Sequence, residues 1–182
     1  MTGPTAGSGR ILGSLRVDGT GIVRVEDRFD SDIDDVWSAI TDPRRLARWH
    51  VKVRGDLHAG GEIHLHVEAD DWEGTGHIEV CEAPRRLLVT TRESDESWRK
   101  GQGVPPFDET LEATLDEVGA KTRLVIEVRG IPLDPLPFYG VGWQIHLENL
   151  ASYLAGRDRG DTEARWEELI PSYQALAADI GK

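Results

Sequence analysis

Two histidines in the middle of the chain have the type and spacing to bind a metal ion. His64 and His66 lie on one side of a predicted strand, with glutamates beside them. If residues 70–73 form the next turn, His77 falls roughly opposite His66, with Cβ atoms about 5 Å apart, which would suit zinc. The alternation, however, places this group on the polar, outward face, and catalytic metals favour a dry cavity. We therefore expect no metal site here.

Nucleophilic and phosphate chemistry find little support in the sequence. The lone cysteine, Cys81, ends an alternating segment, and no histidine partner can be inferred for it. There is no Gly-x-Ser-x-Gly elbow, and Gly101-Gln102-Gly103 lacks the helix and lysine of a phosphate loop. We expect no cofactor and assign no catalytic residue. Whether the protein is an enzyme stays open, and the sequence favours a non-enzymatic role.

Polar groups also lie close to an apolar stripe near residue 140. Trp143, Leu147 and Leu150 recur at helical spacing, and Tyr139 and His146 add polar tips beside them. A buried tyrosine or histidine is more often structural than functional. Ligand pockets nevertheless hold a few polar groups among apolar walls. Both interpretations remain open for these two residues.

The composition limits the classes of partner. The 182 residues carry 33 acidic and 21 basic side chains, a net charge of −12. Such a surface repels phosphate backbones and anionic lipids, so we expect no nucleic-acid or membrane partner. One cysteine excludes a disulfide framework, and no signal peptide is visible. We expect a cytoplasmic monomer or homodimer.

The elements that would position these residues follow from periodicity. Residues 1–9 predict a flexible arm, and residues 10–29 a hairpin that turns at Asp18-Gly19. Ser31 would cap a first short helix, and Asp42-Pro43 would begin a second. From Val51 to Val128 the period is mostly two, which is typical of an antiparallel sheet with one buried face.

Two tryptophans and one long segment depart from this alternation. Trp72 and Trp98 lie in polar segments that predict loops, where they could mark the mouth of a pocket or be buried locally. Residues 94–106 form the one long irregular stretch between strands.

The C-terminal third predicts helices. Asp134-Pro135 would begin a long helix that runs to about Leu154 and stops at Gly156. Residues 157–182 predict a helical tail packed on the domain, which Pro171 breaks into two pieces. The domain itself would span residues 10–156. The fold class is α+β, with a curved antiparallel sheet around one long helix and two short helices after the first strands.

Several segments together resemble the START-like (SRPBCC, helix-grip) superfamily, and within it bacterial homologues of the activator of heat-shock protein 90 ATPase. They occur in order over about residues 19–156: Val36-Trp37-Ser38-Ala39-Ile40-Thr41-Asp42-Pro43 with Leu46 and Trp49, Gly60-Gly61-Glu62-Ile63, Pro84-Arg85-Arg86-Leu87, Lys121-Thr122-Arg123-Leu124, and Gly142-Trp143 with Leu147 and Leu150. The resemblance implies a cavity between sheet and long helix that takes hydrophobic small molecules. It carries no catalytic motif that transfers residue by residue.

We therefore expect the protein to bind a hydrophobic or aromatic small molecule between the sheet and the long helix. Two alternatives stay open: a polyketide cyclase-like or hydrolase-like enzyme using the same cavity, and a chaperone-related or regulatory interaction module. Strand parity and helical spacing predict the lining residues as Trp49, Ile63, Leu65, Val89, Phe107, Leu111, Phe138, Tyr139, Trp143, His146, Leu147 and Leu150.

Overall fold

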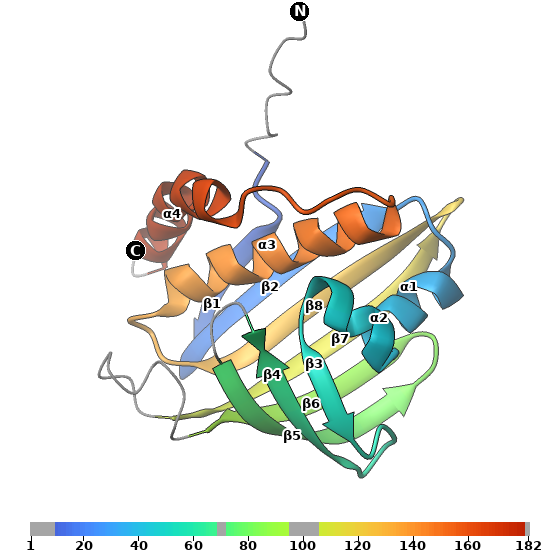
Figure 1. Cartoon of the computed structure of the whole chain (residues 1–182). Coiled ribbons are helices and arrows are strands. Elements are labelled where there is room, and N and C mark those ends of the chain that lie inside the picture. Colours follow the sequence, from blue (N-terminus) through green and yellow to red (C-terminus); the bar gives the residue numbers. More distant parts are fainter. Residues whose placement is uncertain (1–9, 69–71, 95–105, 181–182) are drawn as a thin grey trace, which may run out of the picture.

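One antiparallel sheet curves around a long helix in the computed structural model, which describes residues 10–68, 72–94 and 106–180 (Figure 1). The elements are β1 (Gly13–Asp18), β2 (Thr20–Phe29), α1 (Ile33–Thr41), α2 (Pro43–Trp49), β3 (Lys52–Gly55), β4 (Glu62–Val67), β5 (Trp72–Glu82), β6 (Arg86–Glu93), β7 (Asp108–Val118), β8 (Lys121–Ile131), α3 (Leu136–Leu154) and α4 (Thr162–Asp179). The predicted arm over residues 1–9, Trp98 and most of segment 94–106 lie outside the described residues.

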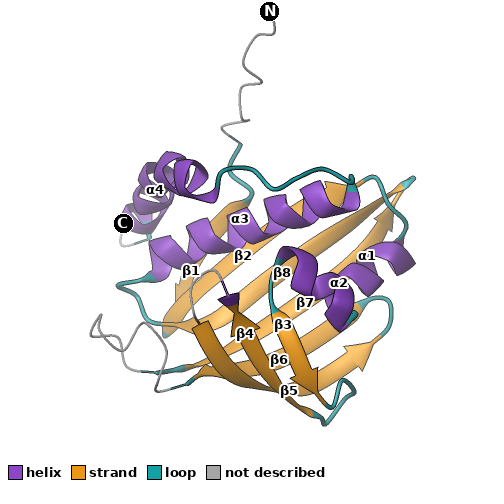
Figure 2. Cartoon of the chain, in the orientation of Figure 1, coloured by secondary structure: helices purple, strands orange, loops and turns teal. Residues whose placement is uncertain are grey.

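The strand order is β1-β2-β8-β7-β6-β5-β4-β3, with every neighbouring pair antiparallel. The sheet is open, with β1 and β3 at its two edges. Figure 2 shows α1, α2 and α3 on the concave side. The predicted α+β fold, with a curved sheet around one long helix, is confirmed. Among the described residues, no helix is long and apolar enough to cross a membrane.

The two short helices begin at aspartates. The carboxylate of Asp32 accepts a hydrogen bond from the amide of Asp35 at 2.8 Å and so caps α1. The prediction of Ser31 as the cap was wrong: its hydroxyl bonds the carboxylate of Asp35 instead. Asp42 caps α2 as predicted, because it accepts from the amide of Arg44 while Pro43 occupies the first turn.

The long helix α3 begins without a side-chain cap. Pro135 occupies the N-cap position, so the prediction that Asp134 caps this helix was wrong. Its fixed φ suits the start of a helix even without a capping carboxylate. The helix ends as predicted near Gly156, whose φ of 66° lets its amide turn back to the carbonyl of Tyr153 at 3.1 Å.

The tail forms one continuous helix, α4, so the prediction that Pro171 breaks it was wrong. A proline removes one helical hydrogen bond, at a cost of about 3 kcal/mol, which tertiary packing can outweigh. Leu169 and Tyr173, on either side of it, are buried in the core. The ring of Tyr173 fits against Gly13 and Gly140, where a Cβ would come within 2.4 Å of it.

The apolar core has two separate parts. The larger fills the space between α3 and the β1-β2-β8-β7 half of the sheet, and it includes Val25, Leu124 and Leu147. The smaller part consists of Ile63, Ile78 and Val89 on β4, β5 and β6. Among the strands, α3 packs against β2 and β1. The helix therefore covers one half of the concave face more closely than the other.

Candidate functional site

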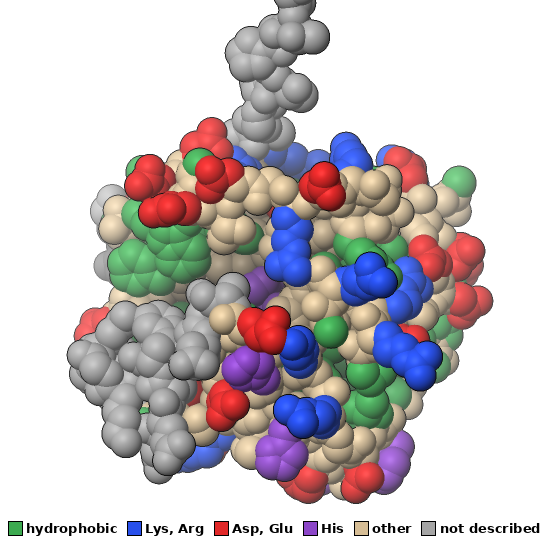
Figure 3. Space-filling model, viewed as in Figure 1, with side chains coloured by type: hydrophobic (Ala, Val, Ile, Leu, Met, Phe, Trp, Pro, Cys, Tyr) green, Lys and Arg blue, Asp and Glu red, His purple; other side chains and the backbone are tan. Residues whose placement is uncertain are grey.

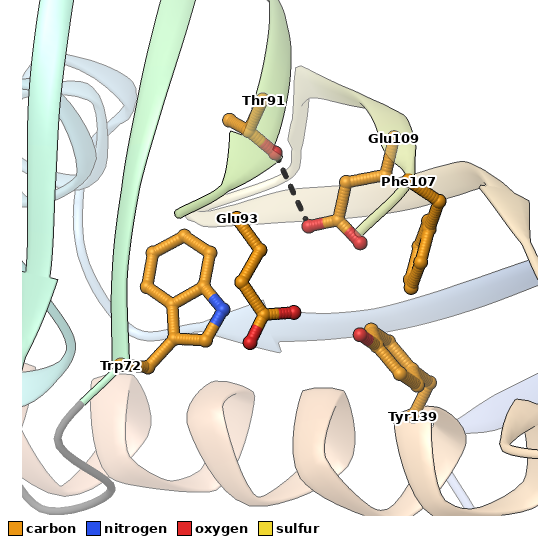
Figure 4. A pocket seen from close by; sticks show the side chains of 6 residues that line it. All are labelled: Trp72, Thr91, Glu93, Phe107, Glu109 and Tyr139. Atoms are coloured by element: carbon orange, nitrogen blue, oxygen red, sulfur yellow. Dashed lines mark hydrogen bonds between the residues drawn. The ribbon is translucent and has the colours of Figure 1, made fainter. Parts of the chain in front are cut away.

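A pocket lies between the sheet and the N-terminal part of α3. Its lining comes from three strands, the segment before β7 and the helix: Trp72, Thr91, Glu93, Phe107, Glu109 and Tyr139 (Figure 4). About 200 Å³ of space free of protein atoms lies among these side chains, and this volume includes open solvent. Figure 3 shows the surface hollowed below α3. We call the concave face of β4, β5 and β6 the hollow; the pocket lies at its end near Tyr139.

Strand register brings the polar groups of the pocket together. Thr91 pairs with Glu109 across β6 and β7, and Glu93 pairs with Gly74 across β6 and β5. The hydroxyl of Thr91 donates a hydrogen bond to Oε1 of Glu109 at 3.2 Å. Glu93 is only 8% exposed. Sequence reasoning missed both glutamates, although the alternation that placed Val89 inward also places Thr91 and Glu93 inward.

Trp72 begins strand β5, so its prediction as a loop residue was wrong. Its half-buried indole lies over the strand beside Gly74, where a Cβ would come within 2.7 Å of the ring. The next inward position is Gly76, where a Cβ would meet Ile63 at 3.0 Å. The two glycines thus lower the floor of the hollow and leave room for the indole. Nε1 of Trp72 is buried and has no hydrogen-bond partner within the described part of the chain.

Phe107 and Tyr139 close the opposite side of the pocket. Their ring centroids are 5.9 Å apart, and the planes are tilted by 59°. Figure 4 shows the hydroxyl of Tyr139 and the carboxylate of Glu93 facing each other in the space between Trp72 on one side and Phe107 and Tyr139 on the other. Together with the indole of Trp72, they place aromatic and acidic groups around one space.

A second aromatic group lies further along α3. His50 lies at the end of α2, and its ring centroid is 4.1 Å from that of His146. Both rings contact Trp143 edge to face. Burial first, and then the nearby charge of Arg159, lowers the pKa of His146 to about 4. Burial first, then the charges of His146 and Arg159, hold the pKa of His50 well below its usual value. Both rings are therefore neutral near pH 7. Sequence reasoning missed His50, which lies at the C-cap of α2 and belongs to no apolar stripe.

The structure distributes the twelve predicted lining residues over several environments. Phe107 and Tyr139 line the pocket, Trp143 and His146 form the second aromatic group, and Ile63, Leu65 and Val89 lie on the floor of the hollow. Phe138 is 42% exposed. The remaining four pack in or against the main core: Trp49, Leu111, Leu147 and Leu150.

The histidines considered for a metal lie on the face of the sheet turned away from α3. The expected pairing of His66 with His77 was wrong, because His66 pairs with Glu73 and His77 with Glu62. Nδ1 of His77 lies 2.6 Å from a carboxylate oxygen of Glu62. Over residues 10–68, 72–94 and 106–180, no group of three or more potential ligands is placed to hold a metal ion.

Comparisons with known proteins agree with this architecture. Residues 30–155 match the sequence model of a family described as "Activator of Hsp90 ATPase homolog 1-like protein". The crystal structure of CalU16 from Micromonospora echinospora is 28% identical, with a TM-score of 0.70 over 91% of this chain and 96% of that one.

Two further solved structures share the fold. DynU16, from the dynemicin biosynthetic locus, is 24% identical over 78% of this chain and 50% of its own, with a TM-score of 0.64. The protein encoded by gene BPP1335 of Bordetella parapertussis is 24% identical over 96% of this chain and 94% of its own, also at 0.64. No curated protein matches the chain.

Proposed function

The chain belongs to the family of activator of Hsp90 ATPase homolog 1-like proteins, and on that premise we propose that it binds a small molecule with an aromatic or apolar body in the hollow. The observation that carries the proposal is the pocket at the end of the hollow, walled by Trp72, Phe107 and Tyr139. Aromatic walls with a few polar groups are typical of small-molecule sites.

The uneven packing of the core supports this proposal. Because α3 packs on β1 and β2, the apolar floor formed by Ile63, Ile78 and Val89 stays separate from the main core. Gly74 and Gly76 deepen the same floor. An apolar ligand placed there would contact both parts of the core, and burial of its own apolar surface would contribute about 25 cal/mol per Å².

Native mass spectrometry of gently purified protein tests the proposal, with the denatured mass as reference. We expect a non-covalent adduct, or saturable binding of naphthylmethanol by the purified chain. Leu65→Trp, which enlarges a half-buried side chain on the floor, should abolish binding. His64→Trp is the matched control, because the neighbouring side chain is exposed on the other face. Absence of both adduct and naphthylmethanol binding in the wild type would contradict the proposal.

An enzyme using the same pocket is the second candidate. Glu93, Glu109 and Tyr139 converge there, and such groups can transfer protons to or from a bound substrate. Incubating the captured ligand with wild-type protein and with Glu93→Gln distinguishes the two candidates. A change in ligand mass or absorption with wild type alone supports catalysis, whereas an unchanged ligand supports binding.

The alternative of an interaction module was suggested by the apolar stripe of the C-terminal tail, and the structure explains that stripe otherwise. The apolar stripe of the tail lies against the domain, where Leu169 and Tyr173 are buried and Trp166 packs on the core. Arg165 adds a hydrogen bond to Glu148 of α3 at 2.7 Å. The stripe therefore forms part of the core, and its pattern needs no partner protein as an explanation.

A further inference from the structure

We propose that His50, His146 and Arg159 together bind a carboxylate group of the ligand beside the hollow. The three side chains come from the end of α2, from α3 and from the connection between α3 and α4. This inference rests on the proposed function, because the apolar body of the same ligand would lie in the hollow. It names the acidic group of the ligand, which neither the family nor the lining of the pocket supplies.

The two histidines lie at the side of the hollow that is formed by β3 and α3. His146 follows Tyr139 of the pocket by seven residues, so it lies on the same side of α3, about 10 Å further along the helix axis. His50 directly precedes the segment that leads into β3, and Val53 of that strand packs against the apolar floor. Since the two ring centroids are 4.1 Å apart, a ligand on the floor would meet both rings together.

Burial decides which nitrogen of each ring carries the proton. Nδ1 of both rings is buried and has no hydrogen-bond partner within the described ranges. In a neutral imidazole one nitrogen donates and the other accepts, and a buried donor without a partner is rarer than a buried acceptor without one. The proton therefore belongs on Nε2, which is not among the buried atoms without a partner. Because both residues are only half-buried, Nε2–H is the donor that a ligand can reach.

Arg159 adds a positive charge to these two donors. Its Nη2 donates a hydrogen bond to the carbonyl of Arg48 at 2.6 Å, which holds the guanidinium at the end of α2, two residues before His50. Burial is the first cause of the lowered pKa of both histidines, and the charge of Arg159 contributes to both shifts, as expected of a cation near both rings. The group thus offers N–H donors and a positive charge, which are the partners that a carboxylate requires.

The surface around this group is basic, although the whole chain carries a net charge of −12. Helix α2 contains three arginines and no acidic residue. Arg45 pairs with Asp35, whereas Arg44 and Arg48 form no ion pair with any carboxylate that the structure describes. At physiological salt, charges more than about 8 Å away are largely screened, so the nearby arginines dominate the potential that a ligand meets here. The local charge therefore favours an anionic group.

Three probes with one ring system test the proposal: naphthoate, naphthylmethanol and naphthylmethylamine. In titration calorimetry near pH 7 and about 0.15 M salt, we expect naphthoate to bind at least about tenfold more tightly than the alcohol, and the amine to bind most weakly. A proton–nitrogen NMR correlation of the imidazoles should show the proton on Nε2 of His50 and His146. Both Nε2 signals should shift on addition of naphthoate.

Variants locate the preference for naphthoate over the alcohol. Arg159→Gln keeps N–H donors but removes the charge, and it should reduce the preference by about tenfold. His146→Phe keeps a ring but removes the donor. It should act in the same direction, and it serves as the second variant should Arg159→Gln fail to fold.

Arg157→Gln is the matched control. It removes the same charge from an exposed residue of the same connection. The charge of Arg157 is not among the causes that lower the pKa of either histidine. The substitution should leave the preference for naphthoate within about twofold.

The outcomes separate the two proposals. Binding of the alcohol or the amine as tight as that of naphthoate would refute the carboxylate site and leave the proposed function standing. The same conclusion would follow if a folded Arg159→Gln or His146→Phe kept the full preference, or if Nδ1 carried the proton in either ring. If none of the three probes binds, both proposals fall. A preference that Arg157→Gln reduces as much as Arg159→Gln would belong to the general surface charge and would also refute the site.

Discussion

Acid should destabilise the protein through its paired histidines, well above the pH at which carboxylates are protonated. His50 and His146 contact each other, and Nδ1 of each is buried without a hydrogen-bond partner within the described part of the chain. Burial favours the neutral ring, so the pKa of His146 falls to about 4 from an unfolded value of about 6.5. The unfolded chain therefore binds more protons than the folded chain as the pH falls through this interval.

The sign and size of the effect follow from that difference. A depressed histidine pKa gives stability that is fully present above about pH 6.5 and is lost as the pH falls towards about 4. For His146 the pKa difference between the unfolded and folded states corresponds to about 3 kcal/mol of folding stability, of which about 2 kcal/mol is lost between pH 7 and pH 5. His50, whose pKa is also lowered, adds to the loss in the same direction.

Urea unfolding at about pH 7 and about pH 5 measures this loss. Asp35 and Glu112 also have lowered pKa values, but carboxylates contribute mainly below about pH 5, outside the measured interval. His146→Phe keeps a ring between its neighbours and should lose about 2 kcal/mol less than wild type on acidification. His64→Gln, whose parent side chain is exposed, should behave as wild type. The reasoning would be refuted if His146→Phe kept the pH dependence of the wild type, or if the His146 ring of the wild type titrated near pH 6.5 by NMR.

Three other substitutions have expected outcomes in chemical unfolding or NMR. Tyr173→Phe removes the 2.7 Å hydrogen bond to Oε1 of Gln144 and should lower the free energy of unfolding by about 1–2 kcal/mol; no loss would contradict that role. Pro171→Ala should raise it by about 1–3 kcal/mol, because alanine restores a helical donor; a lower value would mean that the ring itself stabilises the helix. Gly74→Ala should displace the indole of Trp72 and weaken naphthylmethanol binding, because a Cβ there would come within 2.7 Å of both the ring and the carbonyl oxygen of Arg92; Gly160→Ala, with open space around it, should leave naphthylmethanol binding unchanged.

Local patterns predicted the fold well because each element carries its own signal. The alternation over β4 to β8 identified an antiparallel sheet, and Asp42-Pro43 marked the boundary between α1 and α2. The errors concern choices that depend on neighbours in space. Ser31 and Asp32 are both of types that cap helices well, and in the fold the carboxylate of Asp32 takes the amide of Asp35 while the hydroxyl of Ser31 bonds the carboxylate of Asp35. Pro171 would break an isolated helix, but the buried residues on either side hold α4 together.

The candidate site was harder to predict, because its polar groups converge from segments distant in sequence. Tyr139 and Phe107 could be proposed from spacing and residue type, whereas Glu93 and Glu109 would ordinarily be assigned to solvent. Their inward position, with Glu93 buried and Glu109 half-buried, follows from the register of β6 with β7 and from the curvature of the sheet. The contact of His50 with His146 has the same origin, since it depends on where α2 ends relative to α3.

The opening of the hollow depends on packing at the opposite side of α3. Gln144 of that helix accepts hydrogen bonds from the amide of Leu12 and from the hydroxyl of Tyr173, and it donates one to the carbonyl of Arg10. Gly140 lets the same tyrosine approach the helix axis. These contacts hold α3 over β1 and β2, away from the floor formed by β4, β5 and β6. A tail helix outside the pocket lining thus contributes to the space that the ligand would occupy.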